Sequence, residues 1–150
     1  MLTATPEPIA LNIHYRQATP ADLPSMLQIR RRVLENPENP ASPMPAEVRL
    51  AALLRGGCQV SCAGDRVVGF VQAIEQPPMI GGLYVDPEFE GRGIGKQLLR
   101  LAVQHLRAAG VASIWLSTVA GTRAERLYQS AGWRRSGQSA NEVEYILMLE

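Results

Sequence analysis

Residues 80–102 read Ile-Gly-Gly-Leu-Tyr-Val-Asp-Pro-Glu-Phe-Glu-Gly-Arg-Gly-Ile-Gly-Lys-Gln-Leu-Leu-Arg-Leu-Ala, and this stretch decides the fold. Leu83, Tyr84 and Val85 are typical of the end of a strand, which the following Asp-Pro pair terminates. Beyond a glycine-rich turn, apolar residues recur at the spacing of one helix face, at Ile94, Leu98, Leu101, Ala102 and Leu106. The stretch therefore predicts a strand, a glycine loop and the start of a helix.

The junction between this loop and the helix is suited to bind an anion. The first N–H groups of a helix lack intrahelical partners and carry partial positive charge, which stabilises a phosphate. Gly91, Gly93 and Gly95 have no Cβ, so a ligand can approach the backbone closely. Arg92 and Lys96 add positive charge beside them. The pattern predicts a phosphate site, and an ordinary glycine-rich turn is the alternative.

Two common nucleotide-binding motifs do not match this loop. The P-loop requires a glycine five residues before Gly95 and Ser or Thr after Lys96, but these positions hold Glu90 and Gln97. The dinucleotide-binding fingerprint that would begin at Gly91 requires glycine or alanine at position 96. A nucleoside triphosphate or a dinucleotide is therefore not the expected ligand.

The loop resembles motif A of the GNAT superfamily of N-acetyltransferases, Arg/Gln-x-x-Gly-x-Gly/Ala, which holds the pyrophosphate of acetyl-coenzyme A (acetyl-CoA). Gly93 and Gly95 match its two small positions, and the Tyr-Val-Asp-Pro lead-in is similar to the family's fourth strand. Glu90 stands where Arg or Gln is usual, so it is expected to point away from the ligand. The resemblance implies these cofactor-binding residues: Leu83, Tyr84, Val85, Gly91, Arg92, Gly93, Ile94, Gly95 and Lys96.

A second stretch, residues 121–133, carries the other chemical signal. Leu127, Tyr128 and Ala131 share one helix face, so Tyr128 by itself predicts a half-buried aromatic side chain. The stretch also resembles GNAT motif B, Ala-x-x-Leu-Tyr-x-x-x-Gly-Phe/Trp, at its proper distance after motif A. In the family this tyrosine donates a proton to the departing coenzyme A thiolate. A phenol with a pKa near about 10 suits that task.

The resemblance implies two further cofactor contacts and leaves the general base open. Thr118 and Gly121 are similar to a Thr-x-x-Gly sequence that some branches carry at the end of the fifth strand. Many members carry Asn at the position of Gly121, so only backbone contacts are expected there. Members often place a Glu on the fourth strand, where this chain has two glycines. Glu75, Glu35 or loss of the amine's proton to water are the alternatives for the base.

Length and composition are those of one ordinary globular domain. A chain of 150 residues can bury roughly 70% of its unfolded surface, and 46% of the residues are hydrophobic and 19% charged. The net charge of +1 gives no basis for binding nucleic acid or an anionic membrane. No segment resembles a signal peptide or reaches the length of a membrane span. We expect a single cytoplasmic domain over residues 1–150, with a frayed start over residues 1–10 and a homodimer left open.

The two cysteines favour a reduced protein. Cys58 and Cys62 lie in a predicted strand, where an extended chain separates them by about 13 Å, too far for a disulfide. With two His and no Cys-x-x-Cys pair, no metal site is expected. A covalent transfer through either cysteine is a lesser alternative, because both lie away from the two motifs and lack a His partner.

Apolar periodicity and turn residues predict the remaining elements. Thr19 and the Pro after it are typical of a helix start, and Gly110 is typical of a helix end. Outside the central stretch, the predicted helices cover residues 19–34, 47–55 and 122–131. The predicted strands cover residues 11–15, 58–63, 67–74, 113–119, 133–137 and 143–149, with a Gly-Asp hairpin turn at residues 64–65.

Residues 36–46 contain four prolines and are predicted to be irregular. Glu35, Glu38 and Glu47 lie between positions 33 and 48, a segment with no basic residue. In the resembling family this region helps to form the acceptor pocket. Its acidic residues therefore suggest a cationic amine acceptor.

The order of strands and helices is also similar to that of a GNAT domain. The resemblance implies a mixed, mostly antiparallel sheet of six to seven strands, helices on both faces, and a splay between strands four and five. The implied activity is direct acetyl transfer from acetyl-CoA to a primary amine of a small molecule or peptide. A domain that binds an acyl-CoA and acts as a sensor without turnover is the alternative from another class. The sequence does not name the acceptor.

Overall fold

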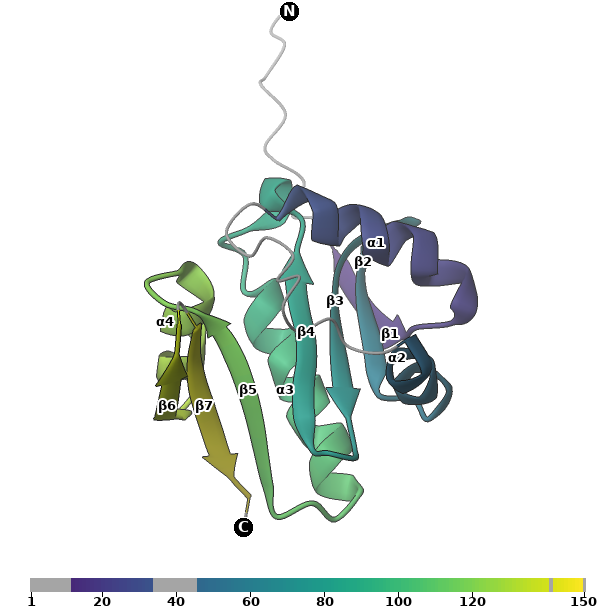
Figure 1. Ribbon diagram of the computed structural model, residues 1–150. Helices are drawn as coiled ribbons and strands as arrows, with labels where there is room; N and C mark the ends of the chain where they lie inside the picture. The colour runs from purple at the N-terminus through teal and green to yellow at the C-terminus, as the bar shows by residue number, and fades with distance from the viewer. Residues whose placement is uncertain (1–11, 34–45, 141, 150) are drawn as a thin grey trace, which may run out of the picture.

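The computed structural model describes residues 12–33, 46–140 and 142–149, which form a seven-stranded sheet with helices on both faces (Figure 1). The strands are β1 (Ile13–Gln17), β2 (Cys58–Ala63), β3 (Arg66–Ile74), β4 (Met79–Val85), β5 (Ser113–Val119), β6 (Arg134–Ser139) and β7 (Glu142–Met148). The helices are η1 (Pro20–Asp22), α1 (Leu23–Arg32), α2 (Ala46–Leu54), η2 (Pro87–Phe89), α3 (Ile94–Ala108) and α4 (Arg123–Ser130), where η denotes a 3-10 helix.

The sheet is divided into two halves. Its strand order is β1-β2-β3-β4-β5-β7-β6, and every neighbouring pair is antiparallel except β4 and β5. These two parallel strands pair only at Met79 and Trp115, where the Trp115 N–H donates to the Pro78 carbonyl at 3.2 Å. Beyond this point the strands diverge (Figure 1). The predicted mixed sheet and its splay between strands four and five are therefore confirmed.

The two faces of the sheet bury separate cores because side chains alternate along each strand. On β3, Val71 belongs to the core that includes Leu98 and Leu106 of α3. Its neighbour Phe70 faces the other way and joins the core that includes Met26 of α1. Helices therefore cover both faces, as predicted, with α1 and α3 on opposite sides of the sheet (Figure 1).

The start of the first helical segment is fixed by an aspartate. Asp22 accepts a hydrogen bond from the Thr19 N–H at 2.8 Å. Its two carboxylate oxygens also accept hydrogen bonds from the two terminal nitrogens of Arg16, at 2.8 and 2.9 Å. The predicted helix over residues 19–34 begins as η1 and continues as α1, which ends at Arg32. The position predicted as its last, residue 34, lies outside the described residues, as do the predicted frayed residues 1–10 and Glu35 and Glu38.

A buried carboxylate joins the end of α1 to the loop that follows β4. The Asp86 side chain is about 2% exposed and accepts bonds from Arg32 at 2.8 Å, Arg66 at 3.1 Å and the Glu88 N–H at 3.0 Å. Burial by itself would raise the pKa of Asp86, but these hydrogen bonds stabilise the ionised form more, so its pKa lies below the ordinary value. Arg32, in the last turn of α1, therefore anchors this loop.

Asp86→Asn is expected to lower the free energy of unfolding at pH 7 by about 1–3 kcal/mol, because it removes a buried charged acceptor. Since the pKa of Asp86 is lowered by folding, its contribution is present above about pH 4 and is lost as the pH falls through the folded-state value. The difference between the two proteins should therefore shrink in acid. Urea unfolding at pH 7 and pH 3 measures it. Glu88→Gln, a change at an exposed carboxylate in the same loop, is the control and should have little effect.

Candidate functional site

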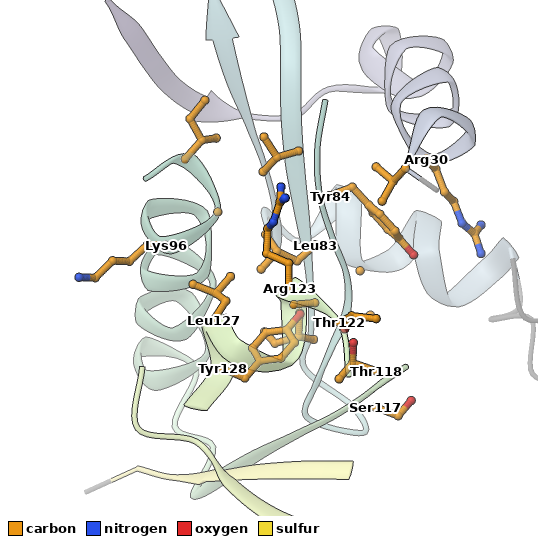
Figure 2. A pocket seen from close by; sticks show the side chains of 18 of the residues that line it. Arg30, Leu83, Tyr84, Lys96, Ser117, Thr118, Thr122, Arg123, Leu127 and Tyr128 are labelled. Carbon is orange, nitrogen blue, oxygen red and sulfur yellow. The ribbon is translucent and has the colours of Figure 1, made fainter. Parts of the chain in front are cut away.

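A cavity of about 550 Å³ opens where β4 and β5 diverge. Its walls come from β4, β5, the loop before α3, the start of α3 and α4, and residues of α1, α2 and β7 also line it. Side chains from these elements converge on it (Figure 2). Of the residues predicted for the site, these line it: Leu83, Tyr84, Val85, Gly91, Gly93, Ile94, Gly95, Lys96, Thr118 and Tyr128. Arg92, Gly121 and Glu75 do not appear in its lining.

The loop before α3 presents unpaired backbone donors to the cavity. Gly93 has φ +78° at the N-cap of α3, and Gly91 has φ +76°, both in the left-handed region that favours glycine. The Gln97 N–H donates to the Gly93 carbonyl at 3.1 Å and closes the first helical turn. The N–H groups of Ile94, Gly95 and Lys96 come before it and have no carbonyl partner within the helix. A phosphate could accept from them at the positive end of the helix dipole.

The basic side chains near this loop contribute less than the sequence suggests. The Arg92 guanidinium lies over the Phe89 ring, 5.3 Å from its centroid. Lys96 extends away from Tyr128 and Thr118 (Figure 2). The anion-binding capacity of the loop therefore depends mainly on its backbone.

The sequence predicts that Glu90 points away from the ligand, but the structure differs. Glu90 lines the cavity, and its carboxylate pairs with Arg123 at the start of α4. Arg123, which the sequence motifs do not predict as a site residue, also lines the cavity. This ion pair links the loop before α3 to α4 and places a negative charge beside the backbone donors.

Tyr128 is a buried residue of the cavity lining. Its side chain is 5% exposed and packs between Trp133 and Tyr145, with ring centroids 5.9 and 6.3 Å away. Burial, with a smaller contribution from Tyr84, raises the pKa of Tyr128 well above that of a free phenol. The hydroxyl therefore stays protonated at neutral pH and can donate a proton or a hydrogen bond.

Gly121 supports α4 and does not line the cavity. Its N–H donates to one carboxylate oxygen of Glu125 at 2.8 Å. The Tyr145 hydroxyl donates to the other oxygen at 2.6 Å, and Gln129 donates to that hydroxyl at 2.9 Å. Glu125 thus connects the turn after β5, the helix that carries Tyr128 and the strand β7.

The structure does not bring Glu75 to Tyr128. Glu75 follows the end of β3, where its carboxylate lies 3.1 Å from His105 Nε2 and 3.8 Å from Arg55. The carboxylates in the described lining are Glu90 and Glu142, and neither is on β4. A base at Glu75 stays a prediction.

Cys58 and Cys62 are buried, unpaired with each other and outside the described cavity lining. Burial raises the pKa of Cys58 to about 11 and also raises the pKa of Cys62. At neutral pH both are protonated thiols, which are poor nucleophiles.

The described residues hold no group of three or more His, Cys, Asp or Glu side chains placed to bind a metal. None of the described helices has the length and apolarity of a membrane span.

β4 carries an irregularity inside the cavity. Its pairing with β3 steps from Gln72–Gly82 to Ala73–Ile80, so Gly81 is an extra residue, a β-bulge, in β4. Gly81, Gly82 and Met79 all line the cavity. Gly81 and Gly82, which stand on the strand where family members often place a Glu, therefore lie at this irregularity of β4.

The splayed sheet of this α/β protein, the unpaired N–H groups at the start of α3 and the buried Tyr128 meet at the same gap. Residues 23–133 match the acetyltransferase (GNAT) family. The chain belongs to this family, which confirms the resemblance of its two motifs.

Similar proteins differ in what their names say they act on. An aminoglycoside N(6')-acetyltransferase type 1 from Stenotrophomonas maltophilia is 28% identical over 89% of this chain and 91% of its own length. A mycothiol acetyltransferase from Nocardia farcinica is 41% identical over 49% of this chain. A [ribosomal protein bS18]-alanine N-acetyltransferase from Haemophilus ducreyi is 31% identical over 47% of it. The matched part of this chain spans 26% and 51% of the length of the last two.

Solved structures share the fold. The PaiA N-acetyltransferase from Thermoplasma acidophilum, in complex with coenzyme A, matches with a TM-score of 0.73 at 17% identity, over 92% of this chain and 99% of that one. Ard1 from Thermoplasma volcanium matches with a TM-score of 0.76 at 18% identity, over 92% and 98%. At this level of identity, the likeness concerns the architecture.

Glu90→Gln is expected to tighten the binding of coenzyme A by about two- to fivefold at low salt, because it removes a negative charge beside the phosphate donors and releases Arg123. The gain should diminish as salt screens the charges. Calorimetric titration measures both effects. Glu88→Gln in the same loop is the matched control, since Glu88 is exposed and does not line the cavity. Unchanged or weaker binding by Glu90→Gln would contradict the expectation.

Proposed function

We propose that the protein is an N-acetyltransferase that moves an acetyl group from acetyl-CoA to a primary amine by direct transfer. One observation carries the proposal: a single cavity extends from the backbone donors at the start of α3 to the buried Tyr128 hydroxyl. A phosphate site and an acid at two positions of one cavity suit a ligand with phosphates at one end and a leaving thiolate at the other.

The residues present fit acetyl-CoA, which supplies the acetyl group as an activated thioester. The N–H groups from Ile94 to Lys96 would hold the pyrophosphate. Beyond Met79, β4 has β3 on one side and no pairing with β5 on the other. Backbone groups of Leu83 to Val85 on the β5 side would therefore pair with an extended pantetheine arm, as an added strand does. A backbone N–H near Val85 would polarise the thioester carbonyl.

Tyr128 would act as the general acid. A thiol has a pKa near about 8.5, so its thiolate leaves more readily when a protonated phenol donates to the sulfur. The raised pKa of Tyr128 keeps that proton available at neutral and mildly alkaline pH. Thr118, which is buried and lines the same cavity, adds a hydroxyl nearby. Arg92 and Gly121 would act indirectly, by supporting the loop before α3 and the start of α4.

The acceptor amine has to lose a proton before it attacks. Glu75 remains a candidate base, to be tested by Glu75→Gln, although its carboxylate is engaged with His105 and Arg55. Release of the proton to water is the other route. A positively charged acceptor is the prediction from Glu35, Glu38 and Glu47. Glu47 is exposed in the first turn of α2, and the other two lie outside the described residues.

A sensor that binds an acyl-CoA without turnover is the competing function. It is favoured by the absence of any carboxylate from the part of the cavity lining that β4 provides.

We further propose a cytoplasmic location, which the two buried, unbridged cysteines support. A small-molecule or peptide amine as partner, and a homodimer, are also proposals.

The first test is calorimetric titration with acetyl-CoA, with ATP and NAD as control ligands. We expect acetyl-CoA alone to bind tightly, and amine-dependent release of free thiol would then separate an acetyltransferase from a sensor. Binding without turnover of any amine would favour the sensor. No binding of acetyl-CoA would overturn both functions.

Tyr128→Phe is expected to lower kcat by about 10²- to 10⁴-fold with little change in the binding of acetyl-CoA, because only the proton donor is lost. Since the pKa of Tyr128 is raised, the wild-type kcat should show no decline from tyrosine ionisation up to about pH 10. Initial rates across pH measure both effects. Tyr15→Phe on β1, outside the cavity lining, is the control. Undiminished kcat in Tyr128→Phe would exclude the tyrosine as acid.

A further inference from the structure

A second cavity of about 350 Å³ lies between α1, α2 and the adjacent face of β3 and β4. Most of the residues that line it are apolar, and they come from two helices and two strands. Those that it does not share with the first cavity are Leu23, Met26, Leu27, Leu50, Phe70 and Gln72. Gln72 is the polar member of this group, so the cavity is suited to an apolar group.

The cavity combines a buried floor with an exposed apolar rim. Met26 and Phe70 are each 3% exposed and belong to the core on this face of the sheet. Leu23, Leu27 and Leu50 are 39%, 47% and 48% exposed. Single exposed leucines are common on protein surfaces, but here three of them surround one hollow. A ligand that covered them would remove apolar surface from water.

The second cavity lies next to the first, because four residues line both. Arg30, Arg49, Gly81 and Tyr84 line both. Tyr84 packs against Phe70 on the second-cavity side, with ring centroids 5.2 Å apart. Figure 2 shows Tyr84 and Arg30 on the same cavity that Tyr128 lines. An acceptor whose amine approaches Tyr128 could therefore extend past Tyr84 into the second cavity.

The described lining of the second cavity offers few partners to an additional ammonium group. None of its lining residues in the described part of the chain is acidic. A polyamine or aminoglycoside would bring further positive charges and hydroxyl groups into a space with few acceptors for them. Burying such groups without partners is unfavourable.

We propose that the acceptor is a primary amine with an apolar substituent, and that the second cavity binds this substituent. The inference rests on the proposed acetyl transfer and specifies the substrate class of that reaction. The apolar group would lie against Met26, Leu50 and Phe70 while the amine faces the first cavity. A free amine and the N-terminus of a peptide with an apolar first residue share this chemistry.

The test compares straight-chain amines from ethylamine to octylamine with agmatine. Agmatine is similar in length to hexylamine but carries a second positive charge, a guanidinium, at its far end. Each methylene that enters an apolar site contributes about a fourfold gain in affinity. We expect kcat/KM to rise by about this factor per methylene until the cavity is filled, and agmatine to react more slowly than hexylamine. Leucinamide and a leucine-initiated tripeptide amide, run in parallel, distinguish the two sources of the amine.

Two leucines of α2 provide a matched pair of variants. Leu50 lines the second cavity, whereas Leu54 lies one turn further on, is 68% exposed and is outside the lining. Leu50→Asn should lower kcat/KM for octylamine by about five- to tenfold and leave ethylamine unchanged, because only the long amine reaches this side chain. Leu54→Asn should behave as the wild type. Thermal unfolding of both variants checks that they are folded.

Equal rates along the amine series, or faster turnover of agmatine, would overturn the inference in favour of a cationic acceptor. If no amine were acetylated, the proposed function would fail separately. The subsite would then be tested by calorimetric titration with octylamine and ethylamine. Tighter binding of octylamine that is lost in Leu50→Asn and kept in Leu54→Asn would still support the apolar subsite. Equal binding of the two amines would exclude it.

Discussion

The single point of pairing between β4 and β5 is the constraint on which the site depends. Parallel neighbours need a crossover connection, and here that connection contains α3. The helix therefore begins at the divergent end of the two strands, where its unpaired N–H groups face the gap. Were β4 and β5 paired along their whole length, the backbone edge of β4 would be used by the sheet and no ligand could occupy it. The loss of ladder hydrogen bonds is thus a condition for the cavity.

Electrostatics and burial divide the site into parts with different tasks. At the start of α3 the backbone dipoles present partial positive charge, and the carboxylate of Glu90 is paired with Arg123. Around Tyr128 the surroundings are apolar and aromatic, so the neutral phenol is the stable form. Beyond Tyr84 the walls become aliphatic. A ligand that fits all three regions needs an anionic end, a proton-accepting centre and an apolar end.

Local signals in the sequence predicted the strands and helices, whereas the arrangement of the sheet and the cofactor-binding residues, most of which line the cavity, were implied by the resemblance to the family. Gly93 and the Asp-Pro pair act on the backbone within a few residues, so the strand, loop and helix could be located without tertiary information. The positions of charged side chains could not. Glu90 is oriented by Arg123, which is 33 residues away in the chain, and Arg32 by Asp86, 54 residues away. Glu75 was a reasonable base by its place near the fourth strand, but its orientation depends on His105 from a helix on one face of the sheet. Such pairs follow from packing, which periodicity does not reveal.

The hydrogen bond between Tyr145 and Glu125 has a consequence for the order in which the molecule folds. It joins residues 20 positions apart, and the helix that carries Tyr128 precedes the strand that supports it. During synthesis α4 leaves the ribosome before β7, so its final position has to await the pairing of β5 with β7. Contacts between residues distant in sequence form late, because the intervening chain must first be closed into a loop. The half-sheet β5-β7-β6 can therefore assemble only after β7 has been synthesised, and Tyr128 is expected to reach its final position only then.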